Sequence, residues 1–263
     1  MTALFLSDPT ISEEEALAEL ARPYQAAAEQ VGQFWRLASR GMELFPWDAS
    51  WYIRQIGRSR VDHALSGARI RGMACRTPSW CSTRQTFFLK AFEHNLEDDP
   101  WLREDVELRC RMAAEAWQQA LTLGETAQTA VPADLRLSFE RNLVDLGRLR
   151  RRALAYAYHL RETNLAQVLR AYPSAPQRVY EDLRATLQAD LANYEEERQA
   201  EGQAARLGMV QLARLAGANP MPDWTEAEEA LRLLEKDPPA FLATYLLETP
   251  GKAEKGVFSV TSR

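Results

Sequence analysis

The sequence predicts an all-α protein, an irregular helical bundle or array of about eight to ten helices. Apolar residues recur at steps of three and four through most of the chain, which is the spacing of one buried helix face. No two segments of alternating apolar residues are joined by a hairpin signal, so no sheet is predicted. The 263 residues, 46% of them hydrophobic, are enough for a substantial core. We expect one helical domain over residues 1–263, or two subdomains at 1–123 and 133–248 followed by a flexible tail at 249–263.

A cap and a proline mark the first two helices. Ser12 and Glu15 form a capping box, because the hydroxyl can accept from the third helical amide while the carboxylate accepts from the amide of the cap. Pro23 has no amide proton, so the first helix should end near residue 21 and Pro23 should open the second. An apolar stripe then carries the second helix to about Leu44.

The next stretch is less regular until a strongly periodic helix begins. We expect a helix over residues 51–65, a long structured loop over 66–83 and a helix over 85–95. The clearest helix spans residues 102–123, where five apolar residues share one stripe. These are Val106, Cys110, Ala113, Trp117 and Leu121. Gly124 is expected to end this helix, at the start of the predicted boundary between the subdomains.

Helical periodicity resumes after that boundary. A long helix is expected over residues 133–172, where Pro173 follows. Pro176 opens another amphipathic helix that runs to about residue 198, with an apolar stripe on one side and charged residues opposite. Three shorter helices complete the prediction, at residues 204–215, 225–236 and 241–247.

A reversal of charge separates one segment from the rest of the chain. Residues 51–90 carry eight basic side chains and one acid, a net charge of +7, whereas residues 1–50 carry −5 and residues 91–263 carry −7. The cations are 28 arginines and four lysines, and the planar guanidinium suits bidentate pairing with phosphate or carboxylate. Aromatic side chains in the same segment can stack on unpaired bases. The predicted nucleic-acid-binding residues are Arg54, Arg58, Arg60, Arg69, Arg71, Arg76, Arg84 and Trp80.

These features predict a non-enzymatic binding or adaptor protein that contacts nucleic acid, single-stranded or RNA, within a larger assembly that includes a protein partner. The overall charge of −5 argues against broad binding of duplex DNA and is compatible with a local basic groove. One alternative is a protein–protein interaction scaffold without nucleic acid. In that alternative the basic segment pairs with an acidic partner, or with the acids at residues 93–99 and 104–107 of the same chain.

A second alternative is enzymatic. Arg152 and His159 lie seven residues apart, about two helical turns, so both side chains leave the same face of a helix. This spacing resembles the arginine–histidine pattern of HEPN-type ribonucleases, which are helical proteins. The resemblance implies that Arg152 stabilises a charged phosphorane and that His159 acts as general acid or base in the attack of a ribose 2′-hydroxyl on the adjacent phosphate. Ala153 stands where that family commonly has a polar residue, and Arg58 with His63 also satisfies the spacing.

The other chemistry-bearing residues predict neither a cofactor nor a metal. The three histidines are far apart in the sequence and lack the paired spacing of a metal site. Cys75, Cys81 and Cys110 are an odd number without metal-ligand spacing, which predicts reduced thiols. Glycine-rich phosphate loops and dinucleotide fingerprints are missing from the sequence.

The sequence also predicts a location. No apolar run approaches the roughly 18 residues that a membrane-spanning helix needs. The first residues contain no basic leader and are followed by three glutamates, which argues against a secretory signal. We therefore expect a cytoplasmic protein that does not associate with membranes.

Overall fold

The computed structural model describes residues 10–46, 100–209 and 225–246, and within these ranges 90% of the residues are helical and none is in a strand. The all-α prediction is therefore confirmed for this part of the chain. It contains six helices of nine or more residues, fewer than the eight to ten predicted for the whole sequence. They are α2 (Glu13–Ala21), α3 (Ala28–Leu44), α5 (Pro100–Ala127), α6 (Ala133–Ala171), α7 (Gln177–Arg206) and α9 (Thr225–Lys236). Short helical turns accompany them: η1 (Arg22–Ala27), η5 (Gln128–Ala130), α10 (Pro238–Phe241) and η6 (Leu242–Leu246).

The first helix begins at the predicted cap, but the second does not begin at the predicted proline. The Glu15 amide donates to Ser12 Oγ at 3.2 Å and the Ser12 amide donates to Glu15 Oε2 at 2.9 Å, so the capping box is confirmed. The second helix does not open at Pro23. Residues of η1 form a 3₁₀ turn instead, in which Gln25 has a φ of +52°, and α3 begins only at Ala28. The left-handed residue redirects the chain, so α2 and α3 are separate helices.

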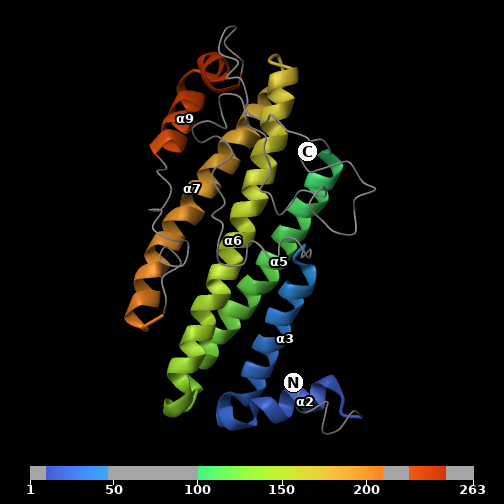
Figure 1. Ribbon diagram of the computed structural model, residues 1–263, viewed down its shortest axis with the longest axis vertical. Coiled ribbons are helices and arrows are strands. Elements are labelled where there is room, and N and C mark those ends of the chain that lie inside the picture. Colours follow the sequence, from blue (N-terminus) through green and yellow to red (C-terminus); the bar gives the residue numbers. More distant parts are fainter. Residues whose placement is uncertain (1–9, 47–99, 210–224, 247–263) are drawn as a thin grey trace, which may run out of the picture.

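Three long helices make the body of the protein. α5, α6 and α7 lie side by side along the long axis, with α3 beside α5 and α2 across one end (Figure 1). The 39 residues of α6 extend about 58 Å at roughly 1.5 Å per residue, and this helix contacts both α5 and α7. α9 packs on α7. Consecutive long helices are antiparallel, because only a short turn joins each one to the next.

Gly124 does not end α5, which continues for three more residues to Ala127. A β-carbon at Gly124 would lie 2.5 Å from Leu143 Cδ2 of α6 and 3.0 Å from Phe34 Cδ2 of α3. The glycine is therefore a point of close approach between three helices, and its lack of a side chain serves packing rather than helix termination.

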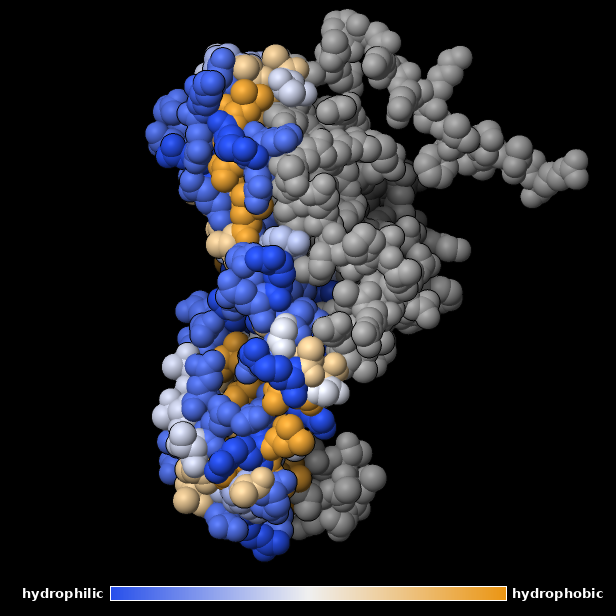
Figure 2. Space-filling model, turned by 90° about the vertical axis from the view of Figure 1, so that its left-hand side faces the viewer, coloured by the Kyte–Doolittle hydropathy of each residue, from blue (hydrophilic) through white to orange (hydrophobic). Residues whose placement is uncertain are grey.

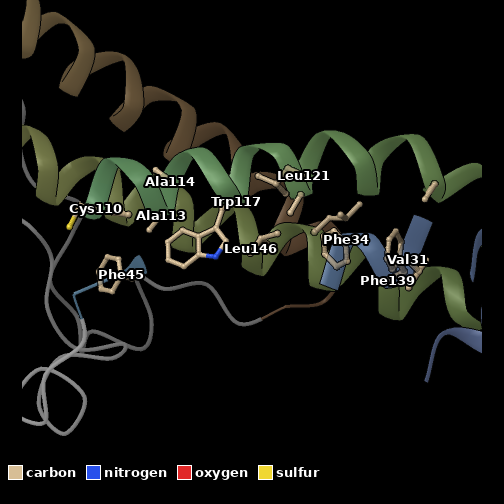
Figure 3. Packing of buried hydrophobic residues seen from close by; sticks show 14 of the residues in the cluster. Val31, Phe34, Phe45, Cys110, Ala113, Ala114, Trp117, Leu121, Phe139 and Leu146 are labelled. Atoms are coloured by element: carbon tan, nitrogen blue, oxygen red, sulfur yellow. The ribbon is translucent and has the colours of Figure 1, made fainter. Parts of the chain in front are cut away.

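The first apolar cluster lies where α3, α5 and the first two thirds of α6 meet (Figure 3). All five residues of the stripe predicted for α5 are buried, so that prediction is confirmed. Trp117 is 1% exposed, its ring lies 5.8 Å from that of Phe45, and its Nε1 donates to the carbonyl of Ala38 at 3.0 Å. Phe34 and Phe139 add an edge-to-face pair with ring centroids 5.3 Å apart.

A second apolar cluster lies at the other end of α6. It joins the C-terminal part of α6 to the N-terminal half of α7 and to α9, α10 and η6. Its buried members are Leu165, Ala166, Leu169, Leu183, Leu187, Ala230, Leu234, Phe241 and Leu242. Because α6 contributes to both clusters, it is the element that connects the two ends of the protein.

The structure also corrects the start of the helix predicted at residues 204–215, of which residues 210–215 lie outside the described part of the chain. α7 continues without a break to Arg206, eight residues past its predicted end, and Leu207 to Met209 then leave the helix around Gly208, whose φ is +67°. The helices predicted at 51–65 and 85–95, the loop at 66–83 and the tail at 249–263 lie outside the described residues.

Candidate functional site

The predicted nucleic-acid-binding residues fall in a part of the chain that the structure does not describe. This applies to each of Arg54, Arg58, Arg60, Arg69, Arg71, Arg76, Arg84 and Trp80. Their role stays a prediction from the sequence. The described residues do bear on the prediction, because they show how the charges of the surrounding helices are used.

The pair that resembles the HEPN pattern lies on α6. The backbones of Arg152 and His159 are both helical, two turns apart, as the spacing requires. The Arg152 side chain is half-buried. The side chain of His159 lies outside what is described, so their catalytic role stays untested.

The arginines that precede this pair point to a different use of the same helix. Arg148 Nε lies 3.0 Å from Glu201 Oε1 of α7, and Arg150 Nη1 lies 2.8 Å from Glu196 Oε1 of α7. Arg151 Nη1 is 3.6 Å from the same Glu196 oxygen. These three arginines therefore do not form a solvated basic face on α6, because α7 supplies carboxylates opposite them.

We call Arg148, Arg150, Arg151, Asn193, Glu196 and Glu201 the α6–α7 polar seam. Besides the ion pairs, it contains one hydrogen bond from a side chain to the backbone. Asn193 Nδ2 donates to the backbone carbonyl of Arg151 at 3.0 Å. Beyond the seam, Arg141 donates from Nε and Nη2 to the carbonyl of Leu207, just past the end of α7, at 3.1 and 2.9 Å. Side chains of α6 thus hold most of the C-terminal half of α7 through polar atoms.

Burial changes the electrostatics of the seam. The side chains of Arg148 and Arg151 are only 9% and 6% exposed. Burial lowers the pKa of Arg151 from its ordinary value, while Glu196 acts in the opposite direction by stabilising the charged form. Arg151 Nε and Asn193 Oδ1 are buried without a hydrogen-bond partner. The seam therefore contains charges whose desolvation is only partly compensated.

The sequence did not reveal Glu196 and Glu201 as partners of these arginines. Glu196 lies on the charged face predicted for the helix that Pro176 opens, and Glu201 lies past the predicted end of that helix at about residue 198. A signal for them exists in the sequence. In an antiparallel helical hairpin, residues at equal distances from the turn face each other, and the α6–α7 turn is centred near residue 174. Arg148 and Glu201 lie 26 and 27 residues from that centre, and Arg150 and Glu196 lie 24 and 22 residues from it. Opposite charges at matched distances would have predicted the pairing.

The described residues contain neither a reactive cysteine thiol nor a metal-binding cluster. Cys110 is fully buried, and burial raises the pKa of its thiol far above the ordinary value, so it does not supply a thiolate at neutral pH. Within residues 10–46, 100–209 and 225–246, no three histidine, cysteine or acidic side chains converge in a way that could hold a metal ion. In that same part of the chain, no helix combines the length and apolar character needed to cross a membrane.

Comparisons with known proteins do not assign the chain to a class. The sequence matches no protein-family model and no curated protein, and the fold matches no solved structure.

Proposed function

We propose that this chain is a non-enzymatic binding or adaptor protein whose basic segment, residues 54–90, contacts single-stranded nucleic acid or RNA within a larger assembly. The observation that carries the proposal is the separation of charge. The described residues contain 20 basic and 27 acidic side chains, a net charge of −7, whereas residues 51–90 carry +7. A segment of this charge on an acidic protein gives a local, oriented attraction for polyanions.

Ion pairs within the helices add support. The scaffold alternative offers the acids at residues 104–107 as partners for the basic segment. Two of them pair within α5: Glu107 Oε1 lies 2.9 Å from Arg111 Nε, and Asp105 Oδ2 lies 4.0 Å from Arg109 Nη1. These carboxylates already have cationic neighbours one helical turn away, which favours an external anion as the partner of the basic segment.

The arginines of α6 support the same conclusion. Arg148, Arg150 and Arg151 belong to the densest basic run in the described helices, and the guanidinium groups of these three pair with α7. While these pairs are closed, the run offers little free charge to a polyanion. The basic segment is therefore the better candidate for a nucleic-acid surface.

The test is a fluorescence-anisotropy titration of labelled single-stranded RNA, single-stranded DNA and duplex DNA. If the segment makes six or more contacts with phosphates, raising the salt concentration from roughly 50 to 200 mM should weaken binding about a thousandfold. The double variant Arg54→Glu with Arg58→Glu should bind more weakly and show a shallower salt dependence. Its control is Arg36→Glu with Arg40→Glu, which changes the net charge equally at exposed positions of α3.

The other outcomes are equally informative. Binding that both double variants weaken equally would show a general charge effect, and binding that neither weakens would place the surface elsewhere. No binding at low salt would favour the protein-interaction scaffold. RNA cleavage that disappears in His159→Ala would favour the ribonuclease alternative.

A further inference from the structure

The two halves of α7 are held to the rest of the protein in different ways. Residues 177–189 bury Leu183 and Leu187 in the second apolar cluster, and Thr186 of the same half is also buried. Residues 190–206 bury Asp190, Asn193 and Ala204, so the only buried apolar side chain in this half is an alanine. The attachment of α7 therefore changes from apolar to polar along its length.

The stripe predicted for α7 from its sequence does not reach as far as expected. Leu191 and Tyr194 continue the apolar spacing past Leu187, but both are half-buried and neither belongs to an apolar cluster. In Figure 1 the ribbons of α6 and α7 separate toward the C-terminal end of α7. Long arginine side chains span this part of the interface. The face of the protein on the α7 and α9 side is correspondingly hydrophilic, with apolar side chains confined to narrow bands (Figure 2).

The free energy of this polar attachment depends on charge and solvent. Glu196 is 49% exposed, so its pairs with Arg150 and Arg151 are open to salt on one side. The unpaired Arg151 Nε and Asn193 Oδ1 lower the net stability of the closed arrangement, because both lose hydration without gaining a partner. Apolar burial, which holds the first half of α7, is far less sensitive to ionic strength.

We propose that residues 190–206 of α7 form an electrostatic latch that opens from α6 while both apolar clusters stay packed. Opening separates Glu196 and Glu201 from their arginines and uncovers three guanidinium groups within four residues of α6. Each of the two states keeps the same core. The equilibrium between them shifts toward the open state as ionic strength rises, because the exposed side of the ion pairs is screened by salt. This inference is independent of the proposed function of residues 54–90.

Hydrogen exchange measured by mass spectrometry on the full chain tests the latch. A detached segment of 17 residues is only marginally helical in water, so its amides lose most of their protection. Raising the sodium chloride concentration from about 50 to about 500 mM should speed exchange in residues 190–206 and leave residues 177–189 unchanged. The variant Glu196→Gln with Glu201→Gln should speed exchange in residues 190–206 about tenfold already at the lower salt.

The matched control is Glu181→Gln with Glu195→Gln. Both residues are on α7 and the change in charge is identical, but Glu195 pairs with Arg198 of its own helix and Glu181 is exposed. This control should leave exchange at low salt within about twofold of the unmodified protein. Protection of residues 190–206 that equals that of 177–189 at both salt concentrations would overturn the proposal. Faster exchange that extends to α3 and α5 would also overturn the proposal, because it would mean that residues 190–206 open only together with the rest of the protein.

Discussion

A missing side chain lets α3 and α5 pack closely around Trp117. A β-carbon built at Gly41 of α3 would overlap the Trp117 ring, which therefore lies directly on the glycine backbone. The same ring donates its one hydrogen bond to Ala38, on the same helix as Gly41. The indole thus fills the interface and also has a hydrogen-bond acceptor for its N–H group. The sequence contains the tryptophan and the glycine but does not show that they are in contact.

Gly41→Ala should destabilise the protein by about 1–3 kcal/mol, because the added methyl group forces the Trp117 ring or the two helices to move. Gly202→Ala is its control, since nothing lies within 4 Å of the added carbon in α7. That change should stabilise by up to about 1 kcal/mol through helix propensity. Urea unfolding monitored by circular dichroism measures both. Equal effects of the two variants would contradict the packing described for Gly41.

The buried thiol of Cys110 makes the stability of the fold depend on pH. Its thiol lies in the first apolar cluster, and burial raises its pKa above the ordinary value of about 9. The folded state therefore keeps the proton at a pH where the unfolded state loses it. Because the unfolded state then binds fewer protons than the folded state, stability is fully present below about pH 9 and is lost as the pH rises further.

Between about pH 9 and 10.5, this one thiol should lower the free energy of unfolding by up to about 1.4 kcal/mol per pH unit. Cys110→Ala should remove that part of the slope, whatever it does to the absolute stability. Urea unfolding at a series of pH values gives both slopes. The raised pKa values of Tyr24, Tyr158 and Tyr180 affect the two proteins equally, so parallel curves would show that Cys110 does not contribute.

At the scale of elements, the helices differ in what determines their ends. α2 begins at a capping box that local sequence specifies completely, with both hydrogen bonds formed. α5 continues through a glycine because α3 and α6 pack against that position. α7 continues to Arg206 although its apolar stripe stops earlier, and contacts with α6 accompany this extension. The start of α2 therefore follows a local signal, whereas tertiary contacts accompany the ends of α5 and α7.

Ser12→Ala should destabilise the protein by about 0.5–2 kcal/mol, since it removes the acceptor of the Glu15 amide at the start of α2. The loss should appear as a lower midpoint in urea unfolding. Ser39→Ala, at an exposed position inside α3, is the matched control and should change stability by less than about 0.5 kcal/mol. If both variants unfold at the same midpoint, the capping box does not stabilise the fold.

At the scale of the whole molecule, α6 joins two apolar clusters and carries the polar seam on its α7 side. The first cluster holds α3, α5 and α6 together, and the second holds α6, α7 and α9. Many of the described arginines form ion pairs within these helices, and the described residues together carry a net negative charge. The basic segment at residues 51–90 is therefore attached to an acidic helical body. The proposed nucleic-acid surface and the proposed latch therefore use two separate sets of arginines.

The sequence by itself determined the helical class, the capping box at Ser12 and the buried stripe on α5, because each depends on residues within a few turns of one another. It also determined the charge reversal at residues 51–90, which is the basis of the proposed site. Tertiary structure decided the role of Gly124 and the partners of Arg148, Arg150 and Arg151. These depend on which faces of helices far apart in the sequence come into contact, and a charged side chain does not itself specify whether water or a carboxylate lies opposite it.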